Sequence, residues 1–239
     1  MGWLWGRFSI FAYWIATTVV YWFIRTFARL EVVDASNVPA EGRVLVVANH
    51  LSNFDPVLVA ACSPRQVRTM AKREMFETPL VGWTVWAYGA FPVRRHSADM
   101  GALRVGRNHL LAGRAVLVFP EGTRAPERAL IPALPGSAML ALLGDAPVVP
   151  VAVNGTEALS GPGAILGGLL RGRPTVRVRF GEPFALAGGG PSASRAEEGT
   201  DQLMRRIAAL LPERYRGAYG PGSEGQIVVA RGQDEADEA

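Results

Sequence analysis

The sequence predicts an α/β domain with a mostly parallel central sheet flanked by helices, preceded by a membrane-associated helix at the N-terminus. Two observations support this fold class. After residue 31, short apolar runs alternate with helical stretches, which is the order found in a parallel sheet with crossover helices. Before residue 31, the chain is apolar and crowded with aromatic side chains, which favour the headgroup level of a membrane.

The composition fits one domain with extensions. Of the 239 residues, 49% are hydrophobic and 19% are charged, which excludes a wholly disordered chain, a collagen and a coiled coil. The single cysteine excludes an internal disulfide framework and a cysteine-based metal cluster. We expect a membrane-associated helix over residues 1–30, a folded domain over 31–217 and a disordered acidic tail over 218–239.

The N-terminal helix contains an uncharged stretch from residue 8 to residue 24, between Arg7 and Arg25. As a helix, this stretch is about 25 Å long, slightly less than the roughly 30 Å hydrocarbon core of a bilayer. Aromatic residues occur at both its ends and in its middle, so a helix that lies in one leaflet and a helix that crosses the bilayer both remain open.

Five apolar segments predict the strands, and three of them are continuously apolar, as in strands that are buried on both faces. These predicted strands cover residues 44–48, 67–70, 115–119, 148–153 and 176–180. The predicted helices cover residues 56–62, 74–87, 98–112, 136–143 and 201–211. Residues 187–200, rich in Gly, Ser and Pro, predict a linker.

The charge distribution predicts an anionic partner. The net charge is +4 and the isoelectric point is near 9.7, although the segment from Glu224 onward holds five acidic residues and one arginine. The rest of the chain is therefore more basic than the whole. Nucleic acid, phosphorylated small molecules and anionic lipid all fit this charge.

Candidate catalytic residues follow the first buried strand. Along one continuous helix, His50 and Asp55 would point away from each other. Because Pro56 is suited to the first turn of a helix and Asp55 to the cap before it, we expect a helix to start at Pro56. Residues 49–54 then form a loop that can fold His50 back toward Asp55. A carboxylate bonded to one imidazole nitrogen leaves the other nitrogen free as a general base.

No protein nucleophile accompanies this pair in the sequence. The chain has no G-x-S-x-G nucleophile elbow, and Cys62 falls in an apolar helix, as a small core residue does. A His-Asp pair without an enzyme nucleophile is expected to deprotonate a hydroxyl of the substrate, or a water.

A candidate anion site follows the third predicted strand, in the segment Phe-Pro-Glu-Gly-Thr-Arg. Gly122 lets backbone N–H groups approach a ligand, Thr123 supplies a hydroxyl, and Arg124 can grip a phosphate with a bidentate fork. Glu121 is expected to emerge at the edge of the sheet. Arg94, at the end of a short apolar segment, could add a further cation.

These segments, in this order, resemble the glycerolipid acyltransferase family, and most closely its 1-acyl-sn-glycerol-3-phosphate acyltransferases. The family block N-H-x-S-x-x-D is similar to residues 49–55, and the block F-P-E-G-T-R is matched in full by residues 119–124. A block that ends in arginine is similar to residues 89–94, and a proline within an apolar strand is similar to Pro150. The resemblance covers about residues 40–185.

The resemblance implies a membrane-bound O-acyltransferase of phospholipid biosynthesis that forms phosphatidic acid from lysophosphatidic acid. It implies that His50 is the base and Asp55 its orienting partner, with acyl-CoA or acyl-carrier protein as co-substrate and neither a metal nor another cofactor. The residues that it implies for substrate binding are Asn49, Ser52, Arg94, Glu121, Gly122, Thr123, Arg124 and Pro150.

One departure from the family keeps other acceptors open. The family often has a lysine or arginine at the position of Leu134, so another lysophospholipid or lipid acceptor remains an alternative, as does a thioesterase that uses water. Arg25 and Arg29 follow the apolar helix, which predicts a cell-membrane location with the catalytic domain on the cytoplasmic face. Nucleic acid is not expected as a partner, because the candidate cations are confined to a compact site.

Overall fold

The computed structural model describes residues 2–78, 81–94, 99–160, 172–186, 190–223 and 229. Its central element is a seven-stranded sheet with the strand order β1-β7-β6-β2-β5-β3-β4. The strands are β1 (Arg29–Val33), β2 (Val44–Ala48), β3 (Val67–Lys72), β4 (Phe91–Val93), β5 (Ala115–Val118), β6 (Val148–Asn154) and β7 (Thr175–Phe180). The helices are α1 (Gly2–Phe27), α2 (Asp55–Cys62), α3 (Arg73–Glu77), α4 (Val81–Ala87), α5 (Met100–Leu111), α6 (Gly136–Gly144) and α8 (Ala193–Leu210).

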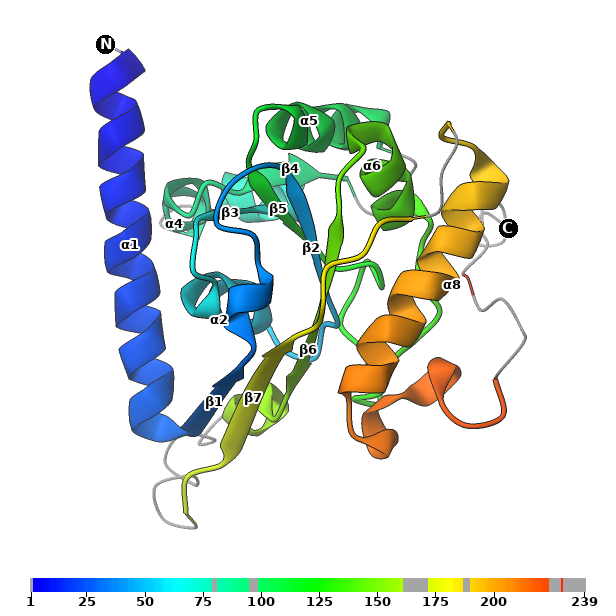
Figure 1. The fold of residues 1–239 in the computed structure, drawn as a ribbon. Coiled ribbons are helices and arrows are strands. Elements are labelled where there is room, and N and C mark those ends of the chain that lie inside the picture. Colours follow the sequence, from blue (N-terminus) through cyan, green and yellow to red (C-terminus); the bar gives the residue numbers. More distant parts are fainter. Residues whose placement is uncertain are drawn as a thin grey trace, which may run out of the picture.

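The sheet is mostly parallel. Strands β6, β2, β5, β3 and β4 all run in one direction, whereas β7 is antiparallel to β6 and β1 pairs in parallel with β7. Helices α1 and α2 lie on one side of the sheet and α8 on the other, so the fold has three layers (Figure 1). The predicted fold class, a mostly parallel sheet flanked by helices, is confirmed.

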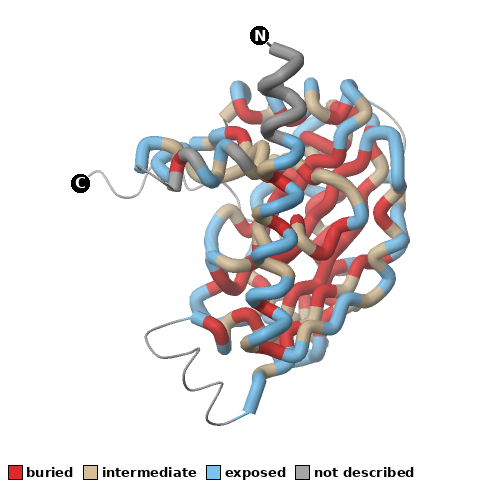
Figure 2. The backbone as a smooth tube through the Cα atoms, turned by 90° about the vertical axis from the view of Figure 1, so that its left-hand side faces the viewer, coloured by how far each residue is buried: buried red, intermediate tan, exposed pale blue. Residues whose placement is uncertain are grey.

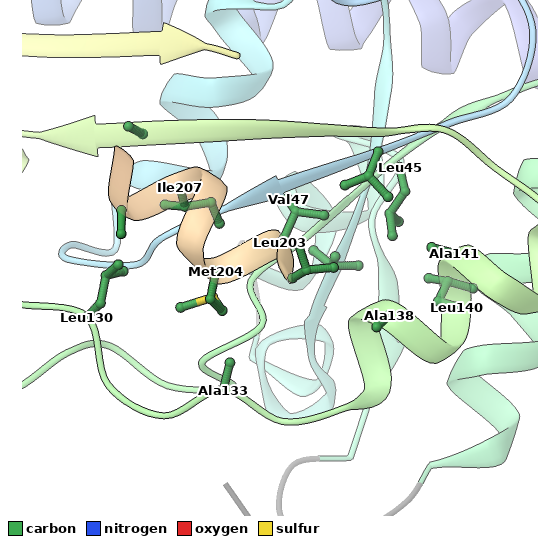
Figure 3. Packing of buried hydrophobic residues seen from close by; sticks show 14 of the residues in the cluster. Leu45, Val47, Leu130, Ala133, Ala138, Leu140, Ala141, Leu203, Met204 and Ile207 are labelled. Carbon is green, nitrogen blue, oxygen red and sulfur yellow. The ribbon is translucent and has the colours of Figure 1, made fainter. Parts of the chain in front are cut away.

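The two faces of the central strands bury alternate side chains. In β2, Val44 and Val46 join the core under α1 and α2, whereas Leu45 and Val47 join the core under α5, α6 and α8. Figure 3 shows Leu203 among the labelled side chains packed in this second core. Each large apolar side chain buried in this way stabilises the fold by roughly 1.5–3 kcal/mol. This two-sided burial explains the uninterrupted apolar sequence of the inner strands.

Helix α1 packs along the domain with only one of its faces. Tyr13 and Ile24 are fully buried on that face, and the Tyr13 hydroxyl accepts a hydrogen bond from the backbone N–H of Val67 at 3.2 Å. The outer face is exposed, as the pale blue segments along the helix show (Figure 2), and it is apolar. Its large exposed side chains are Ile10, Phe11, Trp14, Ile15, Val19, Trp22 and Phe23. The 18 residues Ile10–Phe27 form a stretch that is long and apolar enough to cross a membrane.

The structure differs from the predicted secondary structure in three places. The helix predicted over 74–87 is two helices, α3 and α4. Pro79 disfavours a helical conformation in the residue before it, and Thr78 is extended. The linker predicted over 187–200 overlaps the first eight residues of α8, which begins at Ala193 because the Ser192 side chain accepts a hydrogen bond from the Arg195 N–H and caps the helix. Strand β1 was not predicted because polar residues interrupt it and its burial does not alternate regularly.

Candidate active site

The candidate site lies at one edge of the sheet, where three adjacent parallel strands end. The order β6-β2-β5 brings the chain after Asn154, after Ala48 and after Val118 to the same edge. This is the edge of an open α/β sheet where ligands bind. The first two segments predicted from the sequence, which follow β2 and β5, are therefore neighbours. A third segment, after β6, joins them.

The structure brings His50 and Asp55 together. Nδ1 of His50 lies 3.0 Å from Oδ2 of Asp55, and both residues are buried. The same Oδ2 accepts hydrogen bonds from the backbone N–H groups of Leu51 and Ser52, each at 2.6 Å. Because a carboxylate only accepts, Nδ1 carries a proton, and in the neutral imidazole the lone pair is then on Nε2. The arrangement suits a neutral imidazole that acts as a base through Nε2.

The expected helix cap at Asp55 is wrong. Asp55 is the first residue of α2, and Phe54 occupies the cap position. The carboxylate turns back to the loop before it, where it bonds the N–H groups of Leu51 and Ser52 rather than those of the first helical turn. This turn places Asp55 beside the imidazole of His50, even though the two residues are five apart in sequence.

Asn49 and Ser52 hold the loop that carries His50. The Asn49 side chain donates to the carbonyl of Val153 at 2.9 Å and accepts from the Val153 N–H at 2.7 Å, so the loop is tied to β6. The hydroxyl groups of Ser52 and Ser160 share a hydrogen bond of 2.8 Å, and Ser52 also accepts from the N–H of Phe54. The resemblance implies substrate binding for Asn49 and Ser52, whereas these contacts tie both side chains to the protein.

Glu121 braces the same loop from the other side. Its carboxylate accepts hydrogen bonds from the backbone N–H of His50 at 2.9 Å and from that of Ile131 at 3.2 Å. Only 4% of Glu121 is exposed, and this burial raises the pKa of its carboxyl group to about 7. The two N–H donors lower the pKa and the negative charge of Asp55 raises it further. Glu121 lies beneath the site and not at its surface.

A cavity of about 410 Å³ opens beside the His50 loop. Thr123 and Arg124 line it, as does Leu51, which directly follows His50. The preceding residue, Gly122, has a φ of +67°, a left-handed conformation that a glycine adopts without strain and that turns the chain toward the cavity. The wall also contains Ala125, Pro126, Arg128, Glu157 and Ser160. Two arginines in one wall suit a phosphate or another anionic group.

Of the predicted site residues, Thr123 and Arg124 line this cavity, whereas Arg94 and Pro150 are among those that do not. Arg94 follows β4, the outermost strand, which lies two strand spacings, or roughly 10 Å, from β5. Pro150 is inside β6 opposite Val47, and its carbonyl accepts a hydrogen bond from the N–H of Gly181. Neither is among the described residues that line the cavity.

Three residues around the site were not singled out in the sequence, namely Arg128, Thr156 and Ser160. Thr156 is fully buried, and its hydroxyl donates to Oδ1 of Asp55 at 2.6 Å. One signal in the sequence could have found Thr156: it follows the end of β6 by two residues, just as His50 follows the end of β2 by two. Arg128 is at the surface of a loop and has a left-handed φ of 59°, which no sequence pattern indicates.

The described part of the chain offers His50 no cysteine or serine nucleophile. Burial raises the pKa of the Cys62 thiol to about 12, so this side chain stays protonated at neutral pH. The nearby Ser52 hydroxyl bonds to Ser160 and to the backbone of its own loop, and the described hydrogen bonds include none from it to the imidazole. The geometry of the described residues therefore suits a general base that works without an acyl-enzyme nucleophile.

The fold and this site define a member of the acyltransferase family, to which the chain belongs: the family profile matches residues 29–154. The match includes all four blocks identified in the sequence, together with strands β2, β5 and β6. The chain is therefore an acyltransferase enzyme, and its basic chemistry is the transfer of an acyl group from a donor to an acceptor.

The chain is similar to several proteins named 1-acyl-sn-glycerol-3-phosphate acyltransferase. It is 29% identical over 184 residues to the one from Bacillus subtilis, which covers 76% of this chain and 87% of the relative. The relative from Streptococcus pneumoniae is also 29% identical, over 68% of this chain and 57% of its own length. The one from Saccharomyces cerevisiae is 30% identical over 63% of this chain and 52% of its own length, so the chain spans just over half of these last two relatives.

A solved structure has the same fold. The 1-acyl-sn-glycerophosphate (LPA) acyltransferase PlsC from Thermotoga maritima matches with a TM-score of 0.62 and 24% sequence identity. The match covers 87% of this chain and 88% of that one. At this identity the likeness establishes the architecture and leaves the substrate to be argued separately.

Proposed function

We propose that this acyltransferase transfers a fatty acyl group from an acyl thioester to the free hydroxyl of lysophosphatidic acid and forms phosphatidic acid. One observation carries the proposal, namely the buried His50–Asp55 pair beside a cavity with two arginines. The pair supplies a base for a hydroxyl, and the arginines suit a phosphate. The names of the relatives, which describe acylation of 1-acyl-sn-glycerol-3-phosphate, support the same acceptor.

In the proposed reaction, Nε2 of His50 removes the proton from the acceptor hydroxyl as its oxygen attacks the thioester carbonyl. The C–O bond forms, the C–S bond breaks, and the thiolate leaving group takes up the proton that His50 holds. Asp55 keeps the imidazole oriented and stabilises its positive charge during the transfer. The donor is acyl-CoA or acyl-carrier protein, and the reaction needs neither a metal nor another cofactor.

In the acceptor site we propose, Arg124 and Thr123 bind the phosphate, and Arg128 adds a second positive charge. Glu121 and Gly122 contribute indirectly, because the first holds the His50 backbone and the second sets the turn that presents Thr123. Arg94, at the outer edge of the sheet, is not assigned to this phosphate.

The first experiment is an assay of the purified protein in detergent with labelled acyl-CoA and lysophosphatidic acid. We expect phosphatidic acid to form, and His50→Ala to lower the rate by about 10²–10⁴-fold, which is the usual contribution of general acid-base catalysis. His109→Ala is the matched control, because His109 lies on α5 and bonds to Arg114 away from the site. A His50→Ala variant that keeps most of the wild-type rate would refute the mechanism.

A second acceptor class is favoured by Leu134. Its Cδ1 lies 3.0 Å from the position that a Cβ on Gly122 would occupy, so an apolar side chain covers the turn before Thr123. Another lysophospholipid or lipid acceptor therefore belongs in a panel at fixed donor concentration.

Arg128→Gln should raise KM about tenfold for a phosphate-bearing acceptor and leave kcat within about twofold, since a charge-assisted contact is lost. Free fatty acid released at full rate without any acceptor would instead indicate a thioesterase.

We also propose that α1 attaches the enzyme to the cell membrane. Its outer face is apolar and exposed, while its inner face packs on α2 and α4, so that only the outer face is available to lipid. Arg25 and Arg29 are exposed at the end of the helix and favour a cytoplasmic catalytic domain. Protease digestion of the catalytic domain in inverted vesicles, but not in right-side-out vesicles, would support this orientation, and the reverse pattern would contradict it.

A further inference from the structure

The Asp55 carboxylate is held by two parts of the chain. Its Oδ2 is occupied by the His50 imidazole and by two backbone N–H groups of the adjoining loop. Its Oδ1 accepts one hydrogen bond, at 2.6 Å, from the hydroxyl of Thr156, which is 101 positions away in sequence. Both Asp55 and Thr156 are fully buried, so this hydrogen bond is shielded from bulk water in the intact protein. Thr156 is thus the described donor on the side of the carboxylate that faces away from the base.

The local backbone fixes where Thr156 stands. The preceding residue, Gly155, has a φ of +91°, and a Cβ there would lie 2.1 Å from the carbonyl oxygen of Thr175. Only a glycine fits this turn, and the turn starts the 3-10 helix η2 (Thr156–Leu159) directly after β6. Ser160, at the end of η2, bonds to Ser52 of the His50 loop. The segment after β6 therefore contacts the His50 loop at Ser52 and the first residue of α2, Asp55.

We propose that Thr156 is a positioning residue for acyl transfer, whose hydroxyl fixes the Asp55 carboxylate in the orientation that leaves Oδ2 for the His50 imidazole. Without this donor, Oδ1 would be a buried carboxylate oxygen without its hydrogen bond. The carboxylate would then rotate toward the remaining N–H donors or draw water into the site. Either change misplaces the imidazole and lowers the rate of proton transfer, while the substrate cavity stays intact. The inference rests on the proposed roles of His50 and Asp55 and not on the identity of the acceptor.

The test compares wild type with Thr156→Val, which keeps the shape of the side chain and removes the hydroxyl. We expect kcat to fall about 10- to 100-fold, since a hydrogen bond to a charged group is lost, and KM for donor and acceptor to stay within about twofold. Thr156→Ser, which restores the hydroxyl, should return kcat to within about threefold of wild type. The matched control is Thr200→Val, because Thr200 is also fully buried and also donates one hydrogen bond, to the carbonyl of Ala196 on α8.

A double-mutant cycle separates positioning from general loss of stability. In an Asp55→Asn background, Thr156→Val should lower the residual rate by less than twofold, because its effect passes through the carboxylate. If Thr156→Val does not fold, Thr156→Ala in both backgrounds gives the same comparison. The inference is overturned if either hydroxyl-free variant loses no more activity than Thr200→Val, if only KM changes, or if the effects of the two sites multiply independently. A wild type that acylates another acceptor would refute the acceptor proposal alone, since the same comparison can be made with that acceptor.

Discussion

The buried carboxyl group of Glu121 predicts a stability that falls as pH rises. Burial raises its pKa from 4.5 to about 7 in the folded protein. A group whose pKa is raised on folding binds its proton more tightly in the folded state, so its contribution to stability is fully present below pH 4.5 and is lost as pH rises through 7. Each pKa unit corresponds to about 1.4 kcal/mol, so the loss between these two pH values approaches about 3 kcal/mol.

Glu121→Gln isolates this contribution, because the amide has a similar shape and does not titrate. Its carbonyl can accept from the N–H of His50 or of Ile131, but not from both, so the variant carries a constant cost at every pH. This constant cost does not depend on pH. The free energy of unfolding of the variant minus that of wild type should therefore increase by about 3 kcal/mol between pH 4.5 and pH 8.

Urea denaturation in detergent, followed by tryptophan fluorescence at several pH values, measures this difference. Glu127→Gln removes an exposed carboxylate from the same loop and controls for the loss of one negative charge. A difference curve that stays flat from pH 4.5 to pH 8 would refute the reasoning. A curve of opposite slope would mean that the two N–H donors stabilise the charged carboxylate by more than burial destabilises it.

Two further predictions concern the turn after β6 and the outer face of α1. Gly155→Ala should lower the stability of the fold by about 2 kcal/mol or more, because the new Cβ would lie 2.1 Å from the carbonyl oxygen of Thr175. The value of kcat should fall as well, because Thr156 moves with the turn. Thermal unfolding measures the first effect and the acyltransferase assay the second. Val19→Asp should release the protein from anionic vesicles in a flotation assay, because it places a charge on the lipid-facing side of α1. The free energy of unfolding should change by no more than about 0.5 kcal/mol, since Val19 is 61% exposed. Undiminished flotation would contradict a lipid-facing α1.

The strands that carry the site could be predicted well because their apolar runs have a single physical cause. Strands β2, β5 and β6 are buried on both faces, so nearly every residue in them is apolar and their ends are sharp in the sequence. Strand β1 is paired with β7 at the edge of the sheet, and its exposed positions removed that signal. The first half of α8 was hidden for a different reason. Its glycine and serine residues suggest a linker, whereas its buried face depends on packing against α6 and β6.

The candidate site was predictable in its chemistry and less so in its geometry. His50 and Asp55 stood out because base and carboxylate follow a buried strand, and Arg124 because it ends a glycine turn. The sequence could not show that the Glu121 side chain turns inward, because that depends on the N–H groups of His50 and Ile131, which come from two other parts of the chain. Nor could it show that Arg94 stands apart, since the strand order that separates β4 from β5 is a property of the whole sheet.

The His50 loop is held from both of its flanks, and both supports keep the proposed base in place. From the β5 side, Glu121 accepts from the backbone N–H of His50. From the β6 side, Thr156 donates to the partner of the imidazole, Asp55, and Ser160 bonds to Ser52. The two supports act on different atoms, so their loss should have different signatures. Removing the Glu121 carboxylate shifts the backbone on which His50 stands, whereas removing the Thr156 hydroxyl leaves that backbone in place and changes the carboxylate that orients the ring. The four residues between His50 and Asp55 form a loop too short to pack a core of its own, and the three adjacent strand ends supply the rigidity that it lacks.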